Sequence, residues 1–355
     1  MDGEKVLMKG NEAIGEAAIR SGCRHFFGYP ITPQTELSAY MAKKMPKIGG
    51  VFLQAESELA AINMVYGAAG AGARAMTSSS SPGISLKSEG ISYIAGSDLP
   101  CVIVDIVRGG PGLGGIQPAQ SDYFQIVKGG GHGDYHLLVL APGSVQEMAN
   151  LTATAFNLAD QYRMPCVILG DGTLGQMMEP VDFEKLPKPL EIPKPWATNG
   201  TKRKREHNII NSLYLNPEEL EKTVLDREEK KYRIVREKEQ RWEERLTEDA
   251  EIILVAYGIT ARVVETVVSR LRNEGIKAGM VRPITLWPFP EKAFAPYSPK
   301  LFLSVEMSMG QMVEDVRLTV NGRAPVHFFG RTGGIIPAPE EIIREVKRLL
   351  QERRA

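Results

Sequence analysis

The 355-residue sequence has no excess of charge of either sign and few cysteines. Lysine plus arginine and aspartate plus glutamate each number 43, so the net charge gives no reason to expect binding to nucleic acid or to an anionic membrane. The three cysteines, Cys23, Cys101 and Cys166, are far apart and form no Cys-x-x-Cys pair, which argues against a zinc or iron–sulfur site on this chain. Isolated cysteines in apolar segments are typical of reduced core residues.

Two kinds of apolar segment are also missing. No run approaches the roughly 18 apolar residues of a membrane-spanning helix. The first residues, 1–5, are charged and lack the apolar core of a secretory signal, so we expect a cytoplasmic protein. The sequence does contain 35 glycines and 23 prolines, which predict many tight turns. Its length favours two domains, and 43% hydrophobic residues suffice for their cores.

The first half of the chain alternates short apolar runs with helical stretches. This alternation predicts a parallel sheet covered by helices on both faces. Residues 101–107 are nearly all apolar, as expected for a buried parallel strand. Residues 6–22 have apolar positions at helical spacing and are predicted to form a helix. The other predicted strands are 25–28, 51–54, 73–78, 137–140 and 165–169, and the other predicted helices are 34–45, 57–71, 85–95 and 145–162.

The composition changes after about residue 180. Five prolines between 180 and 195 predict a crossing linker. The basic tetrad at 202–205 predicts a solvated loop more readily than a phosphate site. Charges that alternate in sign at helical spacing over 217–246, with Trp242 on one face, predict a solvated helix. This helix either docks on a partner or only elaborates the linker.

A second α/β unit begins at Glu251 and ends in an amphipathic helix over 337–352. The chain is therefore predicted to have a first domain at 1–190, a linker and charged arm at 191–249, and a smaller domain at 250–355. The predicted strands of the second unit are 252–257, 279–281, 301–305 and 326–330, and its other helices are 261–272 and 310–319.

Four polar features follow predicted strands of the first domain. Because ligands bind beyond the carboxyl ends of parallel strands, these features are expected to converge on one cleft. Each also has an ordinary structural interpretation, such as a turn, a helix cap or a carboxylate favoured by a helix dipole. The four features are Thr32 between two prolines, the pair Glu56 and Glu58, the serine run 78–81, and Arg108 with its glycine-rich loop.

Glu58 is the more informative carboxylate of its pair. It stands at the head of a helix whose next residues are apolar and small, so it would be partly desolvated, which suits a group that shares a proton. Glu56 is two residues earlier and should face elsewhere. The histidine of the glycine-rich segment 129–134, His132, is a second-tier candidate for contact with a cofactor or partner, although a turn or interface role is more common for such a residue.

In this order, these residues resemble the α subunit of 2-oxoacid:ferredoxin oxidoreductases. The resemblance covers nearly the whole chain. The sequence looks most like the branched-chain (3-methyl-2-oxobutanoate) type of this family, with the 2-oxoglutarate type second. The matching segments are 28–33, 54–58, 77–83, 108–112 and 117–122 in the first domain and 281–288, 305–311 and 333–337 in the second.

The resemblance implies an α/β fold and a set of site residues. The first domain would be a thiamine diphosphate-binding, pyrimidine-type domain, and the second a transketolase C-terminal-like domain. Glu58 would hydrogen-bond the aminopyrimidine ring of the cofactor and act in catalysis, while Thr32 and Arg108 would contact the 2-oxoacid. The other implied cofactor contacts are Pro30, Ile31, Ser81, Gly83 and Asp122, and no metal ligand is expected on this chain.

The resemblance further implies a reaction that needs other chains. A branched-chain 2-oxoacid would be oxidatively decarboxylated with coenzyme A to acyl-CoA and carbon dioxide, and ferredoxin would be reduced. Thiamine diphosphate would be shared with a β subunit that carries the diphosphate and Mg²⁺ site and a cluster. The other [4Fe–4S] clusters would also lie on partner subunits, and the further partners would be a γ subunit and a ferredoxin-like δ subunit.

Two other functions remain open at this stage. The same reaction on 2-oxoglutarate is the first, and a non-catalytic nucleotide- or coenzyme A-binding scaffold is the second. Gly170–Gly172 precedes Asn199 at roughly the spacing of a thiamine diphosphate fingerprint, but the prolines between them break the βαβ unit that this fingerprint needs. A self-sufficient transketolase-like enzyme is therefore not expected.

Overall fold

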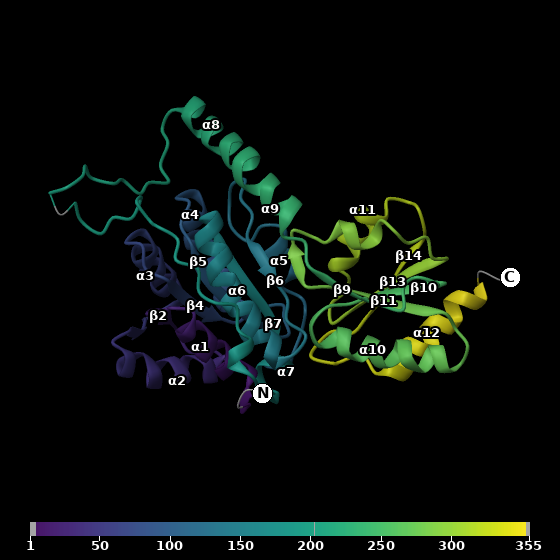
Figure 1. Ribbon diagram of the computed structural model, residues 1–355. Helices are drawn as coiled ribbons and strands as arrows, with labels where there is room; N and C mark the ends of the chain where they lie inside the picture. The colour runs from purple at the N-terminus through teal and green to yellow at the C-terminus, as the bar shows by residue number, and fades with distance from the viewer. Residues whose placement is uncertain (1–4, 202, 353–355) are drawn as a thin grey trace.

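The computed structural model describes residues 5–201 and 203–352, which form two α/β domains joined by a helical arm (Figure 1). Residues 1–4, on which the expectation about the N-terminal segment rests, and Lys202 of the basic tetrad lie outside the described residues. Within the described ranges, no helix has both the length and the apolar character needed to cross a membrane.

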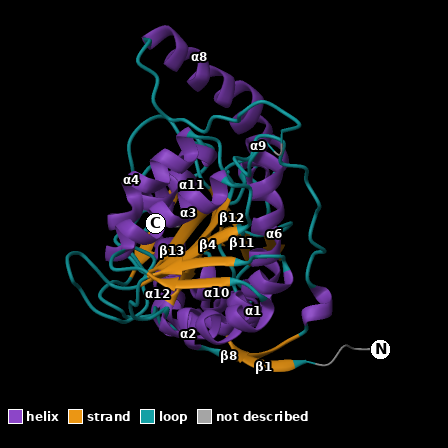
Figure 2. Ribbon diagram, turned by 90° about the vertical axis from the view of Figure 1, so that its left-hand side faces the viewer, coloured by secondary structure: helices purple, strands orange, loops and turns teal. Residues whose placement is uncertain are grey.

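The first domain is built on a seven-stranded sheet in the order β12-β6-β7-β5-β4-β2-β3. Six strands are parallel, and only β12 runs antiparallel, against β6. The central strands β4, β5 and β7 are fully buried between helices (Figure 2), which explains why β5 and most of β7 are apolar. The strands are β2 (His25–Gly28), β3 (Val51–Gln54), β4 (Ala75–Ser79), β5 (Cys101–Val107), β6 (Leu138–Leu140), β7 (Pro165–Asp171) and β12 (Thr285–Trp287).

Helices cover both faces of this sheet (Figure 1). The α/β prediction with a parallel sheet is confirmed, but the helix predicted over 6–22 is wrong at its start. Residues 6–9 form a short strand, β1 (Val6–Lys9), which pairs with β8 (Met178–Val181). The helices are α1 (Gly10–Arg20), α2 (Thr35–Lys44), α3 (Glu58–Gly70), α4 (Pro82–Gly96), α5 (Tyr123–Val127), α6 (Val145–Tyr162) and α7 (Gly172–Gln176), with 3-10 turns η1 (Met45–Ile48) and η2 (Phe183–Lys185).

The second domain has a five-stranded sheet in the order β14-β13-β10-β11-β9. Four strands are parallel, and β9 pairs antiparallel with β11 at the edge. The elements are β9 (Trp242–Arg245), β10 (Ile252–Val255), α10 (Gly258–Asn273), β11 (Ala278–Pro283), η4 (Glu291–Phe294), β13 (Leu301–Glu306), α11 (Met312–Val320), β14 (Val326–Gly330) and α12 (Pro339–Glu352).

The charged arm is helical only as far as Lys238. It consists of α8 (Pro217–Arg227), a π-helical turn η3 (Glu228–Tyr232) and α9 (Arg233–Lys238). The prediction of one helix over 217–246 is therefore wrong for its last residues, because Trp242 lies in β9 and pairs with Pro283 of β11. A four-residue edge strand is too short for its alternation to compete with the helical charge pattern in sequence.

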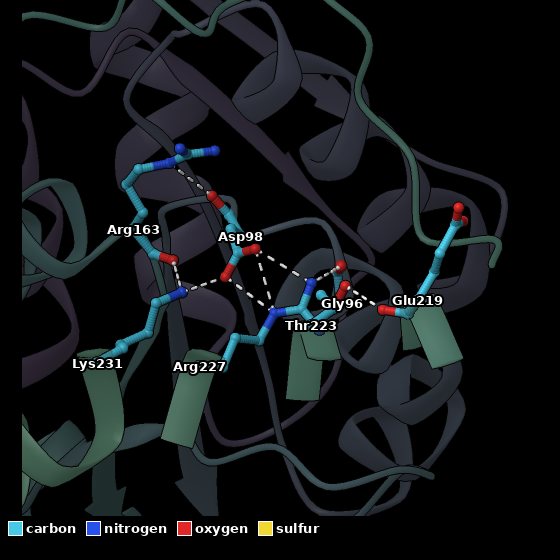
Figure 3. A network of polar contacts seen from close by, with 7 residues as sticks. All are labelled: Gly96, Asp98, Arg163, Glu219, Thr223, Arg227 and Lys231. Atoms are coloured by element: carbon cyan, nitrogen blue, oxygen red, sulfur yellow. Dashed lines mark hydrogen bonds and ion pairs between the residues drawn. The ribbon is translucent and has the colours of Figure 1, made fainter. Parts of the chain in front are cut away.

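The arm is attached to the first domain through Asp98 (Figure 3). The Nε of Arg227 donates to both carboxylate oxygens of Asp98 at 3.1 Å, and the ammonium group of Lys231 forms a second ion pair with it. Lys231 also donates to the carbonyl oxygen of Arg163 at 2.9 Å. These contacts hold one end of the arm, while α8 itself has no buried residue and projects from the molecule (Figure 1).

Gln120 joins the two domains. Its side-chain amide donates to the carbonyl oxygen of Tyr257 at 2.8 Å, and its side-chain oxygen accepts from the hydroxyl of Thr260 at 2.8 Å and from the backbone N–H of Met307 at 2.9 Å. Because all these groups are buried, the contact fixes the second domain beside the carboxyl ends of the first sheet.

Candidate active site

Arg108 brings two predicted loops together at the carboxyl edge of the first sheet. It directly follows β5, is only 7% exposed, and its Nη1 donates to the carbonyl oxygen of Thr32 at 2.9 Å. Its Nη2 donates to the carbonyl oxygen of Leu113 at 3.3 Å. The loops after β2 and β5 therefore fix the orientation of the Arg108 guanidinium. Thr32 itself is exposed.

Glu58 is the buried carboxylate of its pair. It is the first residue of α3, whose cap Ser57 accepts a hydrogen bond from the N–H of Ala60 at 3.1 Å. Glu58 is 6% exposed, whereas Glu56 is exposed. A Cβ atom added to Gly83 would lie 2.7 Å from Glu58 Oε1, so the backbone of α4 approaches this carboxylate closely because residue 83 has no side chain.

Ser81 links the turn after β4 to β5. Its Oγ accepts from the N–H of Arg108 at 3.1 Å and lies 3.2 Å from the Arg108 carbonyl oxygen, to which it donates. It precedes α4 but does not cap it with its side chain, and its φ is +25°, an unfavourable angle for a non-glycine residue. Hydrogen bonds to Asp105 and Arg108 therefore hold Ser81 in place. The helix cap that the serine run suggested is not formed by the Ser81 side chain.

Asp105 and Asp122 form a buried pair of carboxyl groups behind Ser81. The N–H of Ser81 donates to Asp105 Oδ1 at 3.3 Å. Burial and the facing carboxylate of Asp122 raise the pKa of Asp105 well above its usual range. Burial also raises the pKa of Asp122, against the opposing effects of hydrogen bonds and of the Arg108 charge.

Several buried polar atoms on β4, α4 and β5 and in the loops after β4 and before α5 have no hydrogen-bond partner among the described residues. Such atoms are uncommon in folded proteins, and a cluster of them is typical of a place that binds a polar group. An aminopyrimidine ring has both donors and acceptors and so fits this set. The atoms are the hydroxyl oxygens of Thr77, Ser79 and Ser80, Lys87 Nζ, and one carboxyl oxygen each of Asp105 and Asp122.

The other predicted residues have less direct links to this cluster. Pro30 is exposed and Ile31 is half-buried, both on the loop that carries Thr32. His132 is exposed, and its carbonyl oxygen accepts from the hydroxyl of Ser92 at 2.6 Å. Asp171 of the discounted fingerprint caps α7 and accepts from the N–H of Ile259 at 3.2 Å, which gives it a structural role.

Sequence reasoning missed Lys87, Asp105 and Gln34. Asp105 carried a signal, because it is the one charged residue in the apolar run 101–107. Lys87 carried none, since a lysine on a helix is normally solvated. Gln34 is buried and accepts from the hydroxyl of Ser78 at 2.6 Å, so it ties the Thr32 loop to β4.

Comparison with known proteins identifies the family. Residues 16–255 match the family described as pyruvate flavodoxin/ferredoxin oxidoreductase, thiamine diphosphate-binding, and residues 250–342 match core domain II of pyruvate:ferredoxin oxidoreductase. The chain belongs to the 2-oxoacid:ferredoxin oxidoreductase family. The resemblance seen in its motifs is thereby confirmed, as is the presence of a thiamine diphosphate-binding domain.

Curated relatives match along nearly their full length. The ketoisovalerate oxidoreductase subunit VorB of Methanothermobacter marburgensis is 49% identical, with 98% of each chain covered. The 2-oxoglutarate synthase subunit KorA of Methanothermobacter thermautotrophicus is 38% identical, with 98% of this chain and 99% of that one covered. Both relatives are named as enzyme subunits, so this chain belongs to a family of multi-subunit enzymes.

A solved structure has the same fold. The 2-oxoglutarate:ferredoxin oxidoreductase from Magnetococcus marinus, which holds 2-oxoglutarate, coenzyme A and succinyl-CoA, matches with a TM-score of 0.85 and 28% identity. The match covers 98% of this chain and 65% of that one, so the solved protein is considerably longer.

Proposed function

We propose that this chain is the α subunit of an enzyme that converts 3-methyl-2-oxobutanoate and coenzyme A to acyl-CoA and carbon dioxide while reducing ferredoxin. The observation that carries the substrate class is the greater likeness to a ketoisovalerate oxidoreductase subunit, at 49% identity, than to a 2-oxoglutarate synthase subunit, at 38%. The same reaction on 2-oxoglutarate is the second candidate, favoured by the solved structural relative.

In this proposal each site residue has a separate task. The positive charge of Arg108, aimed by the carbonyl oxygens of Thr32 and Leu113, binds the substrate carboxylate. The exposed hydroxyl of Thr32 donates to the carboxylate or the 2-oxo oxygen. Glu58 hydrogen-bonds the aminopyrimidine ring through its carboxyl group. Thiamine diphosphate, when bound, supplies the carbon nucleophile that this chemistry needs.

The remaining cofactor contacts are proposed for residues that border Glu58 and Arg108. Gly83 lets α4 approach the cofactor ring, and Ser81 and Asp122 support the loop that carries Arg108. Pro30 and Ile31 would contact the ring from the loop after β2.

A partner chain is proposed to complete the site. Large apolar side chains next to the site residues are exposed, among them Leu113, which is 83% exposed. Exposed apolar groups gathered around a polar site are typical of an interaction surface. We assign this surface to a β subunit that carries the diphosphate and Mg²⁺ site and a cluster, and we assign the other [4Fe–4S] clusters to further partner subunits, among them γ and a ferredoxin-like δ subunit as additional partners of the complex. The apolar residues are Leu59, Leu86, Leu113, Ile116 and Met309.

The proposal is tested on the intact complex. The tagged chain is isolated anaerobically with its bound partners, and viologen reduction with coenzyme A is measured across a panel of 2-oxoacids. The branched-chain function predicts the highest kcat/KM with 3-methyl-2-oxobutanoate. A preference for 2-oxoglutarate would replace the substrate and keep the reaction, and no reduction with any 2-oxoacid would favour a non-catalytic scaffold.

The role of Glu58 is tested in the same complex. Glu58→Gln keeps the size of the side chain and removes its ability to exchange a proton, so turnover should be lost while the subunits still assemble. A Glu58→Gln complex that retains wild-type turnover would contradict the assignment.

A further inference from the structure

The connection that leads into α8, residues 207–215, has two different sides (Figure 1). Every second residue is half-buried, and one of these, Ile210, packs against the core of the first domain. The residues between them are exposed. This alternation is typical of a strand-like segment with one side on the protein and the other in solvent. Three residues of the exposed side are large and apolar: Ile209, at 84% exposure, Leu213, at 65%, and Leu215, at 87%.

The inner side of segment 207–215 is held on the first domain. The side-chain amide of Asn208 donates to the carbonyl oxygens of Pro195 at 2.6 Å and Ala197 at 2.9 Å. The Cβ of Ser212 lies 3.5 Å from the place where a Cβ atom on Gly96 would stand, so it contacts the end of α4. A segment that is already positioned loses little conformational freedom when it binds. Its apolar side is therefore suited to a partner.

The helix that follows has the same exposed character. α8 has 11 residues, and none of them is buried. A helix of this length is only marginally stable in water without tertiary packing. Its two leucines, Leu220 and Leu225, are 43% and 60% exposed. The apolar surface of segment 207–215 is thus followed directly by an uncovered helix, which favours a contact that covers both.

The two ends of this region carry opposite charge. Three basic residues precede the segment, three acidic residues stand at the start of α8, and all six are exposed. None of them forms an ion pair with another described residue. The single opposite charges, Glu206 at the basic end and Lys222 at the acidic end, do not cancel these excesses. The six residues are Arg203, Lys204, Arg205, Glu218, Glu219 and Glu221.

This pattern is self-complementary when two copies lie antiparallel about Ser212. Ile209 and Leu215 are each three residues from Ser212, and Asn208 and Asn216 are each four residues from it. Antiparallel copies therefore place isoleucine opposite leucine, and they place the basic end of one copy beside the acidic helix start of the other. A two-fold axis generates a contact of this kind between identical chains. An unrelated partner would not require this internal symmetry.

We propose that segment 207–215 and the start of α8 form an interface between two copies of this chain, related by a two-fold axis near Ser212. The exposed side chains of Ile209, Leu213 and Leu215 pack face to face, with the two first domains on the outer sides. The flanking charges pair across the axis and fix the antiparallel register. This interface goes beyond the proposed function and does not depend on it.

The register is tested by crosslinking in the intact complex. Two differently tagged copies are co-expressed, one with Ile209→Cys and the other with Leu215→Cys, and the complex is treated with a short bismaleimide. The native cysteines of this chain are buried, so the reagent reaches only the introduced thiols of the two copies. The mixed pair should crosslink at least about tenfold more than two Ile209→Cys copies, whose thiols would lie about 20 Å apart along the segments.

Charge reversal tests the complementarity of the two ends with the same crosslink. Arg203→Glu with Lys204→Glu should lower the yield about fivefold or more, because like charges then face each other. Glu218→Lys with Glu219→Lys should have the same effect. When all four reversals are combined in each copy, opposite charges face each other again, and the yield should return to within about twofold of the starting value.

Two controls accompany these variants. Leu318→Cys in both copies places an exposed thiol on α11 and should give only background crosslinking. Glu229→Lys with Glu237→Lys reverses two exposed carboxylates further along the arm and should leave the yield of the mixed pair unchanged.

The outcomes decide between a second copy and another partner. A mixed pair that crosslinks in the expected register, and is rescued by the combined charge reversal, supports the interface. Crosslinking no stronger than in the Leu318→Cys control overturns it, as does attachment of the segment cysteines to a different subunit. A combined variant without rescue also overturns it. None of these readouts uses turnover, so they stand apart from the choice of 2-oxoacid.

Discussion

At the residue scale, Arg108 is the side chain whose geometry is most demanding. Its two Nη groups each donate to a loop carbonyl oxygen, and its charge is proposed to bind the substrate carboxylate. A lysine has one point of charge and cannot form this fork. In Arg108→Lys we expect kcat/KM for the preferred 2-oxoacid to fall about 100-fold, the loss expected from one charge-assisted hydrogen bond and its orientation.

Steady-state kinetics of the complex check this prediction. Arg20→Lys is a suitable control, because Arg20 forms an exposed ion pair with Glu16 on α1. If Arg108→Lys retains kcat/KM within about twofold of the wild type, Arg108 does not bind the substrate.

The same residues show how far sequence reasoning extends at this scale. Thr32, Glu58 and Arg108 could be selected because each follows a strand, and the carboxyl ends of parallel strands share one edge. Lys87 could not be selected, because its burial depends on the packing of α4 against α3 and the sheet, and no local sequence pattern reports that packing. Asp105 could have been selected from its apolar surroundings alone.

At the element scale, the packing of α3 against α4 positions Glu58 relative to Gly83. Gly90 on α4 is part of this contact, and a Cβ atom there would lie 2.5 Å from Ile62 Cγ2 on α3. Gly90→Ala should therefore destabilise the chain by about 1–3 kcal/mol through overpacking. The thermal unfolding midpoint of the complex measures this loss.

Gly67→Ala is the matched control on α3. A Cβ atom at Gly67 meets nothing within 4 Å, so alanine should be neutral or stabilise the helix by up to about 1 kcal/mol. Equal thermal unfolding midpoints for Gly90→Ala and Gly67→Ala would mean that the absence of a side chain at Gly90 is not needed for α3 and α4 to pack closely.

The arm depends on one carboxylate. Asp98 has a φ of +52° and pairs with Arg227 and Lys231. Asp98→Asn keeps a residue that tolerates this φ but removes the charge, which leaves two partly buried cations without their anionic partner. We expect the backbone amides of 217–238 to exchange hydrogen about tenfold faster or more.

Hydrogen exchange followed by mass spectrometry measures this effect. Asp226→Asn removes a carboxylate of the same arm that forms only an exposed ion pair with Lys230, and should leave the exchange unchanged. Equal exchange of 217–238 in Asp98→Asn and the wild type would show that the arm is held by other contacts.

The elements themselves were largely predictable, and the exceptions have a common cause. Strands β5 and β14 and helix α6 match their predicted ranges, because apolar runs and helical spacing continue over their whole length. β9 and β12 were missed, since each has three or four residues and pairs with a strand from a distant part of the chain. Their formation depends on tertiary pairing rather than on local pattern.

At the scale of the whole molecule, β12 and the arm connect regions that the sequence suggested were separate. β12 leaves the second domain and extends the sheet of the first, and Trp287 of this strand stacks on His136 with ring centroids 4.4 Å apart. Tyr232 of the arm meets the same imidazole edge-on at 5.1 Å. One histidine ring therefore contacts the crossing strand and the arm.

This histidine makes the stability of the molecule depend on pH. Burial lowers the pKa of His136 to about 4; the positive charges of Arg236 and Lys128 add to this effect, and Asp134 opposes it. The pKa of an unfolded histidine is about 6.5, so between these two pH values the unfolded chain binds a proton that the folded chain does not. The contribution of His136 to stability is therefore complete above about pH 6.5 and is lost as the pH falls toward 4.

His136→Phe keeps an aromatic ring against Trp287 but cannot be protonated. We expect the thermal midpoint of this variant, relative to wild type, to rise steadily as the pH is lowered from 7 to about 4.5. His132→Gln, at an exposed histidine of the same loop, should show no such pH-dependent difference. If the difference between His136→Phe and the wild type is constant across this range, protonation of His136 does not weaken the contact among the first domain, β12 and the arm.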